Sequence, residues 1–171
     1  LLVVDDNENN RYMLTRRLQR EGYQNLATAN DGRQALAMLR TRSFDLVLLD
    51  ITMPEMNGYQ VLEQMKADAQ LRDIPVVMIS AIEDTESVVR CIELGADDYL
   101  PKPFDPTLLR ARVRAILEKK ALRDEVRTHA GQVEEWNQNL ERRVQEQLAQ
   151  LDRLGKLKGF FSPQVVESIL D

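Results

Sequence analysis

The sequence predicts a doubly wound α/β domain, a five-stranded parallel sheet covered by helices, followed by one long C-terminal helix. Short apolar segments alternate with amphipathic helical segments up to about residue 120, and this alternation is typical of βαβ units with right-handed crossovers. From Asp105 onward no strand pattern occurs, and helix-forming residues dominate to about residue 154.

Five segments are predicted to be strands. Those at 45–50 (DLVLLD) and 75–80 (PVVMIS) are nearly continuous apolar runs, as expected for parallel strands that are covered on both faces. The other three are LLVV (1–4), NLATA (25–29) and DYLP (98–101).

Four helices are predicted between these strands, near 8–21, 32–41, 58–69 and 85–95. Turn-forming sequences, NDG and MNG, mark the entries of the second and third helices. Gly22 is expected to stop the first helix. The buried face of that helix is expected to consist of Tyr12, Met13, Leu14 and Leu18.

Composition argues against several classes of protein. A hydrophobic share of 43% in 171 residues is ample for a packed core, and the net charge of −5 gives no general attraction to nucleic acid or anionic membranes. The single Cys91, predicted to be buried, excludes an internal disulfide, and the single histidine argues against a histidine-based metal centre.

The chain carries no membrane or secretion signal. No apolar run approaches the roughly 18 residues that a membrane span requires, and there is no signal peptide, so the expected location is the cytoplasm. Because the chain opens without methionine inside a predicted strand, we expect both ends to be cuts in a longer protein.

The long helix is predicted to form a coiled coil over residues 121–158. Apolar residues recur in alternating steps of four and three, with His129 at one seam position. After Leu140 the next apolar residue is Val144, a step of four where three is due, which indicates a stutter that locally unwinds the supercoil. The seam consists of Leu122, Val126, Val133, Trp136, Leu140, Val144, Gln147 or Leu148, Leu151 and Leu154.

A partner helix is expected for this seam. Residues 121–158 contain seven basic and seven acidic residues, a balance that suits self-association rather than nucleic-acid binding. We therefore predict a homodimer. The alternative is a single helix that folds back on the α/β domain.

Five polar residues end or directly follow the predicted strands. They therefore lie at the carboxyl ends of the strands, where ligands bind in doubly wound sheets. Asp5 and Asp6 follow the first strand, Asp50 ends the third, Ser80 ends the fourth and Lys102 follows the fifth. Converging carboxylates repel one another unless a cation lies between them, and hard oxygen ligands suit Mg²⁺. A lysine and a hydroxyl beside them predict a phosphoryl-transfer site in which a carboxylate attacks phosphorus. Taken singly, each residue has a simpler role, such as Asp6 capping the first helix.

Four segments resemble the receiver domain of two-component response regulators: VVDD (3–6), LLDITMPEMNG (48–58), VVMISA (76–81) and GADDYLPKPF (95–104). The resemblance covers roughly residues 1–120 and implies a flavodoxin-like sheet of order 2-1-3-4-5. It also implies a histidine kinase as the phosphodonor.

The resemblance assigns roles to individual positions. Asp50 would be the phosphoacceptor, and Asp5, Asp6 and the backbone carbonyl of Thr52 would join it around Mg²⁺. Ser80 and Lys102 would contact the phosphoryl group, and Tyr99 would swing inward behind Ser80. The Lys102–Pro103 bond would be cis.

The end of the chain, residues 140–170, resembles the segment that precedes the catalytic domain of class III adenylate/guanylate cyclases. The resemblance implies that residues 159–171 begin a truncated output domain, with Ser162 capping a new helix that starts at Pro163. We therefore predict a response regulator that signals through a dimeric coiled coil to a nucleotide cyclase, with no cyclase activity in this fragment.

Other outputs stay open. A kinase, a phosphatase or a DNA-binding domain can follow a receiver, and a stand-alone phospho-switch or aspartyl-phosphate enzyme is a further alternative. The stand-alone enzyme gives no role to fifty residues of helix. A DNA-binding regulator requires a basic helix-turn-helix, which residues 159–171 do not supply.

Overall fold

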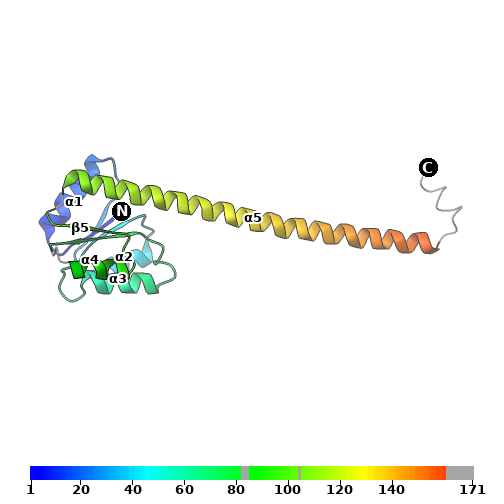
Figure 1. The fold of residues 1–171 in the computed structure, drawn as a ribbon, viewed down its shortest axis with the longest axis horizontal. Helices are drawn as coiled ribbons and strands as arrows, with labels where there is room; N and C mark the ends of the chain where they lie inside the picture. The colour runs from blue at the N-terminus through cyan, green and yellow to red at the C-terminus, as the bar shows by residue number, and fades with distance from the viewer. Residues whose placement is uncertain (82–84, 104, 161–171) are drawn as a thin grey trace. The chain divides into compact units, whose positions relative to one another are not determined.

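The computed structural model describes residues 1–81, 85–103 and 105–160, with side chains described up to residue 154. It confirms the predicted fold: one five-stranded parallel sheet of order β2-β1-β3-β4-β5 with helices between the strands (Figure 1). The elements are β1 (Leu2–Val4), α1 (Glu8–Arg20), β2 (Ala27–Ala29), α2 (Gly32–Thr41), β3 (Val47–Asp50), α3 (Gly58–Ala67), β4 (Val76–Ser80), α4 (Thr85–Glu93), β5 (Asp98–Pro101) and α5 (Pro106–Phe160).

Both faces of the sheet are covered, which explains why the central strands are apolar throughout. Alternate residues of a strand point to opposite faces. In β3, Val47 and Leu49 belong to the core cluster that contains the buried residues of α2, α3 and α4, whereas Leu48 belongs to the cluster that contains those of α1 and α5. The strands are therefore buried on both sides, as the sequence predicted.

Helix α1 buries a narrower face than expected. Leu14 and Leu18 are buried, because residues four apart lie on one side of a helix, but Tyr12 and Met13 are 62% and 45% exposed. The ring of Tyr12 instead lies under the guanidinium of Arg16, 5.9 Å away. The prediction of four buried residues was wrong for these two.

The ends of α1 follow standard capping chemistry. At its start the cap is Asn7, whose side chain accepts hydrogen bonds from the backbone of Asn9 and Asn10, so Asp6 is not the cap. At its end Gly22 adopts a positive φ of 93°, and the N–H of Tyr23 reaches back to the carbonyl of Leu18. This Schellman arrangement confirms the predicted stop.

Helix α5 extends from Pro106 to Phe160 and takes part in two compact units, Leu1–Leu122 and Arg123–Asp171. In the first unit the side chain of Asp105 accepts hydrogen bonds from the backbone N–H groups at the start of α5, which lowers the pKa of that carboxyl, and Leu109, Val113 and Ile116 are buried. The predicted break at Ser162–Pro163 and the helix after it lie outside the described residues.

The predicted seam is exposed in the single chain. From residue 123 to residue 154 its apolar members are 45–76% exposed: Val126, Val133, Trp136, Leu140, Val144, Leu148, Leu151 and Leu154. Within the described part of the chain, none of the helices is long and apolar enough to cross a membrane.

The Gly58→Ala substitution is expected to destabilise the domain by about 1–3 kcal/mol. A Cβ at this position would lie 2.3 Å from the carbonyl oxygen of Asp50 and 2.9 Å from the Cα of Ile51, and backbone atoms cannot move aside cheaply. Urea unfolding followed by circular dichroism measures the loss.

The matched control is Gly131→Ala in α5, where a Cβ meets no other atom within 4 Å. Replacing this exposed helical glycine is expected to favour the helix by about 1 kcal/mol. A Gly58→Ala variant as stable as the parent chain would contradict the steric argument.

Candidate functional site

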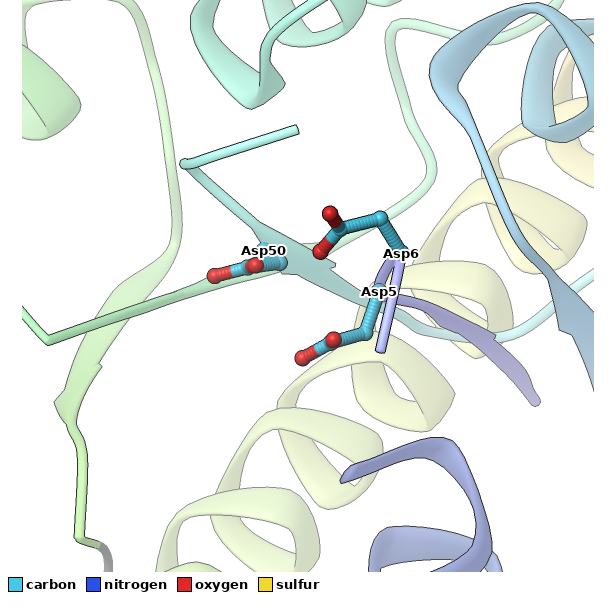
Figure 2. A group of neighbouring side chains, drawn as sticks. All are labelled: Asp5, Asp6 and Asp50. Carbon is cyan, nitrogen blue, oxygen red and sulfur yellow. The ribbon is translucent and has the colours of Figure 1, made fainter. Parts of the chain in front are cut away.

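Three aspartates gather at the carboxyl ends of two neighbouring strands. Val4 of β1 pairs with Leu49 of β3, so the chain continues on one side into Asp5 and Asp6 and on the other into Asp50. One ligand oxygen from each of the three carboxylates lies within 4.8 Å of the others (Figure 2). Asp5 and Asp50 are buried, whereas Asp6 is exposed at the rim.

Lys102 links the two buried carboxylates. Its Nζ lies 2.7 Å from Oδ2 of Asp5 and 2.9 Å from Oδ1 of Asp50. The backbone holds this lysine in place, because the N–H of Lys102 donates to the carbonyl of Ser80 at 2.6 Å. The Lys102–Pro103 peptide bond is cis, as the family resemblance implied.

At Asp50 and at Lys102, burial and the ion pair between them have opposite effects on the pKa. Burial, together with the charges of Asp5 and Asp6, raises the pKa of Asp50, although Lys102 opposes this rise. Burial alone would lower the pKa of Lys102, but its contacts with Asp5 and Asp50 outweigh burial and raise it. The lysine is thus held charged, while the Asp50 carboxylate carries an unfavourable negative charge that a further cation would relieve.

The other residues predicted for the site lie near it or behind it. Ser80 is fully buried at the end of β4, next to Ile79, which pairs with Asp50. Thr52 follows the buried Ile51 two residues after Asp50 and is exposed. Tyr99 lies in β5, partly buried against the core cluster of α2, α3 and α4.

Two further side chains, those of Asn10 and Arg11, hold Asp5 and Asp6 in place, and the sequence analysis missed both. The side-chain amide of Asn10 donates to both oxygens of Asp5 at 3.2 Å, and the backbone N–H of Asn7 donates to Oδ1 of Asp5 at 2.9 Å. The guanidinium of Arg11 donates to the backbone carbonyls of Asp5 and Asp6 at 2.7 and 3.0 Å. The available signal was their place on the first two turns of the helix that directly follows the two aspartates.

An acidic pocket with a bridging lysine, at the carboxyl ends of a doubly wound sheet, defines a class of phosphoryl-transfer signalling domains. Residues 1–114 match the family model described as the response regulator receiver domain. The chain therefore belongs to the response regulator receiver family of two-component systems.

Similar proteins support this assignment. DNA-binding response regulator MtrA of Mycolicibacterium paratuberculosis is 47% identical over 119 residues, which is 70% of this chain and 51% of that protein. Response regulator PleD of Caulobacter vibrioides is 42% identical over 127 residues, 74% of this chain and 28% of that protein. This chain thus spans about half of the length, or less, of such curated relatives.

Solved structures agree with the fold. The receiver domain of NtrX from Brucella abortus matches with a TM-score of 0.64 and 36% identity, over 68% of this chain and 97% of that chain. A receiver domain of a histidine kinase from Syntrophus aciditrophicus matches with a TM-score of 0.64 and 35% identity, over 69% and 89% of the two chains. The receiver recognised from four short segments is confirmed.

Without added divalent metal, Asp50→Asn is expected to be more stable than the parent chain, increasingly so as pH rises. The folded-state pKa of Asp50 is raised, so its ionisation costs stability as pH rises from the unfolded value near 4 through the folded value. Asparagine keeps the shape and removes the charge. Urea unfolding in EDTA across this pH range measures the difference.

The control is Asp45→Asn, which removes an exposed carboxylate that pairs with Lys120, outside the site. It should give no such gain in stability. The measured quantity is the free energy of unfolding of Asp50→Asn minus that of the parent chain. If this difference falls between pH 4 and neutral pH, the Lys102 ion pair outweighs burial.

Proposed function

We propose that Asp50 is the phosphoacceptor of this receiver and that a histidine kinase is its donor. The observation that carries the proposal is the Lys102 ammonium lying between the carboxylates of Asp5 and Asp50. In the reaction an Oδ of Asp50 attacks phosphorus while the bond from phosphorus to the donor nitrogen breaks, and that nitrogen keeps the bonding electron pair. Lys102 would then pair with the phosphoryl oxygens and balance their charge.

The carboxylate cluster fits Mg²⁺. Three hard carboxylate oxygens within 4.8 Å, two of them buried, form the kind of incomplete oxygen shell that this ion prefers, with waters completing it. Asp5, Asp6 and Asp50 would hold the ion, with the backbone carbonyl of Thr52 as a further ligand. When bound, the ion supplies charge neutralisation for the transferring group.

The remaining switch residues lie along the β4–β5 side of the site. We assign Ser80 to hydrogen-bond the phosphoryl group, since it ends β4 directly after Ile79, the residue that pairs with Asp50. Tyr99 is assigned to follow Ser80 inward. The donor would approach along a groove of about 380 Å³ that is lined by Asn10, Met13, Arg17, Ala81, Lys102 and Pro103.

With Mg²⁺ present, a small phosphodonor such as acetyl phosphate is expected to add one phosphoryl group to the parent chain and none to Asp50→Asn. Asp5 and Asp50 are both buried and both contact Lys102, but the two oxygens of Asp5 already accept hydrogen bonds from the side-chain amide of Asn10, and the receiver resemblance assigns the acceptor role to Asp50. Intact-mass spectrometry reads the result, with Asp45→Asn as the control that should still be phosphorylated. Equal uptake by the parent chain and Asp50→Asn would contradict the assignment.

The exposed seam supports a parallel homodimer through residues 121–154. Leaving this many large apolar side chains in water is unfavourable, and burying four or five of them per helix is worth about 1.5–3 kcal/mol each. Since residues 121–158 contain seven basic and seven acidic residues, a second copy meets no net repulsion along the helix. Parallel pairing would bring two copies of any following output domain together.

A fragment ending at residue 118 is expected to be a monomer, or a much weaker dimer, while the full chain dimerises. The fragment keeps the buried contacts of Leu109, Val113 and Ile116 and loses the seam. Sedimentation equilibrium gives both association constants. Dimerisation of the short fragment with the same affinity as the full chain would show that the seam is not the interface.

We propose a class III nucleotide cyclase as the output, supported by the resemblance of residues 140–170 to the segment preceding such catalytic domains. A DNA-binding output is the second candidate, because several relatives carry names such as DNA-binding response regulator or probable transcriptional regulator. The similarity to those relatives lies in the receiver, a module that serves many outputs.

A longer protein that contains this chain and its proposed cyclase domain, assayed with ATP and with GTP, is expected to release a 3′,5′-cyclic nucleotide. Asp50→Asn is expected to change the rate of that release. The fragment 1–171 serves as the control and should release none. If the longer protein instead carries a DNA-binding or kinase domain after residue 171, the cyclase proposal is refuted and the receiver assignment stays intact.

A further inference from the structure

The only histidine of the chain lies on the seam of α5 beside a carboxylate. Nε2 of His129 is 3.8 Å from Oε1 of Glu125, one helical turn earlier, and both side chains are more than 60% exposed. Two metal-ligating atoms are therefore already adjacent on one helix and open to solvent. Residues four apart on a helix lie on the same face, which is the spacing at which two side chains can hold one ion.

Pairing with a second copy doubles these ligands. His129 holds a core position in the alternating pattern of the seam, between Val126 and Val133. In a parallel, in-register coiled coil each core residue faces its own counterpart, so the two imidazoles would meet in one layer. Glu125 flanks the same layer from each helix. One histidine per chain becomes two per dimer, which removes the argument from composition against a histidine-based centre.

We propose that Glu125 and His129 of two copies form a binding site for a divalent transition-metal ion of the zinc class; this inference rests on the proposed dimer. Two imidazole nitrogens and two carboxylate oxygens are a donor set that Zn²⁺ accepts in tetrahedral geometry. The two glutamates carry the charge that balances the ion. Without an ion, two polar imidazoles share a layer between apolar valine layers, which is costly.

The site would also select one arrangement of the helices. If the same seam paired antiparallel, with Leu122 opposite Leu154, His129 would face Gln147 of the other copy and the two ligand pairs would lie far apart. The ion is therefore expected to stabilise only the parallel, in-register dimer. That is the arrangement an output domain placed after the coil requires if two copies of it are to meet.

The test is metal binding by the full chain 1–171 with Mg²⁺ in excess, so that the acidic pocket of the receiver is occupied. Co²⁺ is the probe, because a four-coordinate site gives it a strong visible absorption that six-coordinate sites lack. We expect one such Co²⁺ per dimer, displaced by one equivalent of Zn²⁺. Sedimentation equilibrium in EDTA and with Zn²⁺ should show a dimer at least about tenfold tighter with the metal, because the ion binds the dimer and has no such site on the monomer.

Three variants separate this site from a merely structural histidine. His129→Leu keeps the seam apolar and should dimerise well in EDTA, yet give no Co²⁺ absorption and no response to Zn²⁺. Glu125→Gln should weaken the response, while Glu135→Gln, a carboxylate six residues from His129 and off its helix face, should leave it unchanged.

The outcomes are distinct. A chain that is monomeric both in EDTA and with Zn²⁺ overturns the dimer and the metal site together. A dimer that lacks the four-coordinate Co²⁺ absorption, or a His129→Leu dimer that retains it, overturns the metal site alone.

Discussion

The receiver is organised around one electrostatic constraint: three carboxylates share a space in which their charges repel. Ligand oxygens of Asp5, Asp6 and Asp50 lie within 4.8 Å of one another, and two of these residues are buried. Lys102 offsets part of the repulsion by contacting Asp5 and Asp50 at once. The pKa of Asp50 stays raised by burial and by its acidic neighbours, so the site still favours added positive charge. A buried cluster of this kind lowers the free energy of unfolding, and the packing of the apolar core offsets that loss.

The sheet and its loops hold the cluster together against that repulsion. Parallel pairing of β1 with β3 fixes the two acidic strand ends side by side, and the apolar strands are packed between helices in the two core clusters. The loop after Asp50 is closed by the N–H of Gly58 donating to the carbonyl of Ile51 at 2.9 Å, an approach that no side chain at position 58 would allow. Asn10 and Arg11 fix Asp5 through its side chain and its backbone. Together these contacts hold the carboxylates at fixed positions in the cluster.

The sequence was most informative where chain connectivity alone decides the geometry. Once β1, β3, β4 and β5 are recognised as parallel strands, their carboxyl ends fall on one edge of the sheet. The strand order 2-1-3-4-5 that the family resemblance implied then brings Asp5, Asp50 and Lys102 near one another on that edge. Asn10 was missed because its role depends on the rotation of α1 about its own axis, which a 3.6-residue period defines only to within a residue. The same limit explains the error at Tyr12 and Met13: apolar residues next to a buried stripe are not necessarily in it, and Met13 lines the groove beside Lys102 instead.

Helix α5 has two apolar faces with the same spacing of four and three residues, one buried in the receiver core and one exposed. Leu109, Val113 and Ile116 are buried in the receiver core, and steps of four and three continue that face to Lys120, which pairs with Asp45. The exposed seam begins at Leu122 rather than at residue 123, so it is displaced by one residue, or about 100° around the helix, from the phase of the buried face. Because the two faces do not coincide, the helix can bury one without covering the other. Within the seam the spacing itself changes at the four-residue step from Leu140 to Val144, a step that locally unwinds a left-handed supercoil wherever such a helix pairs with another.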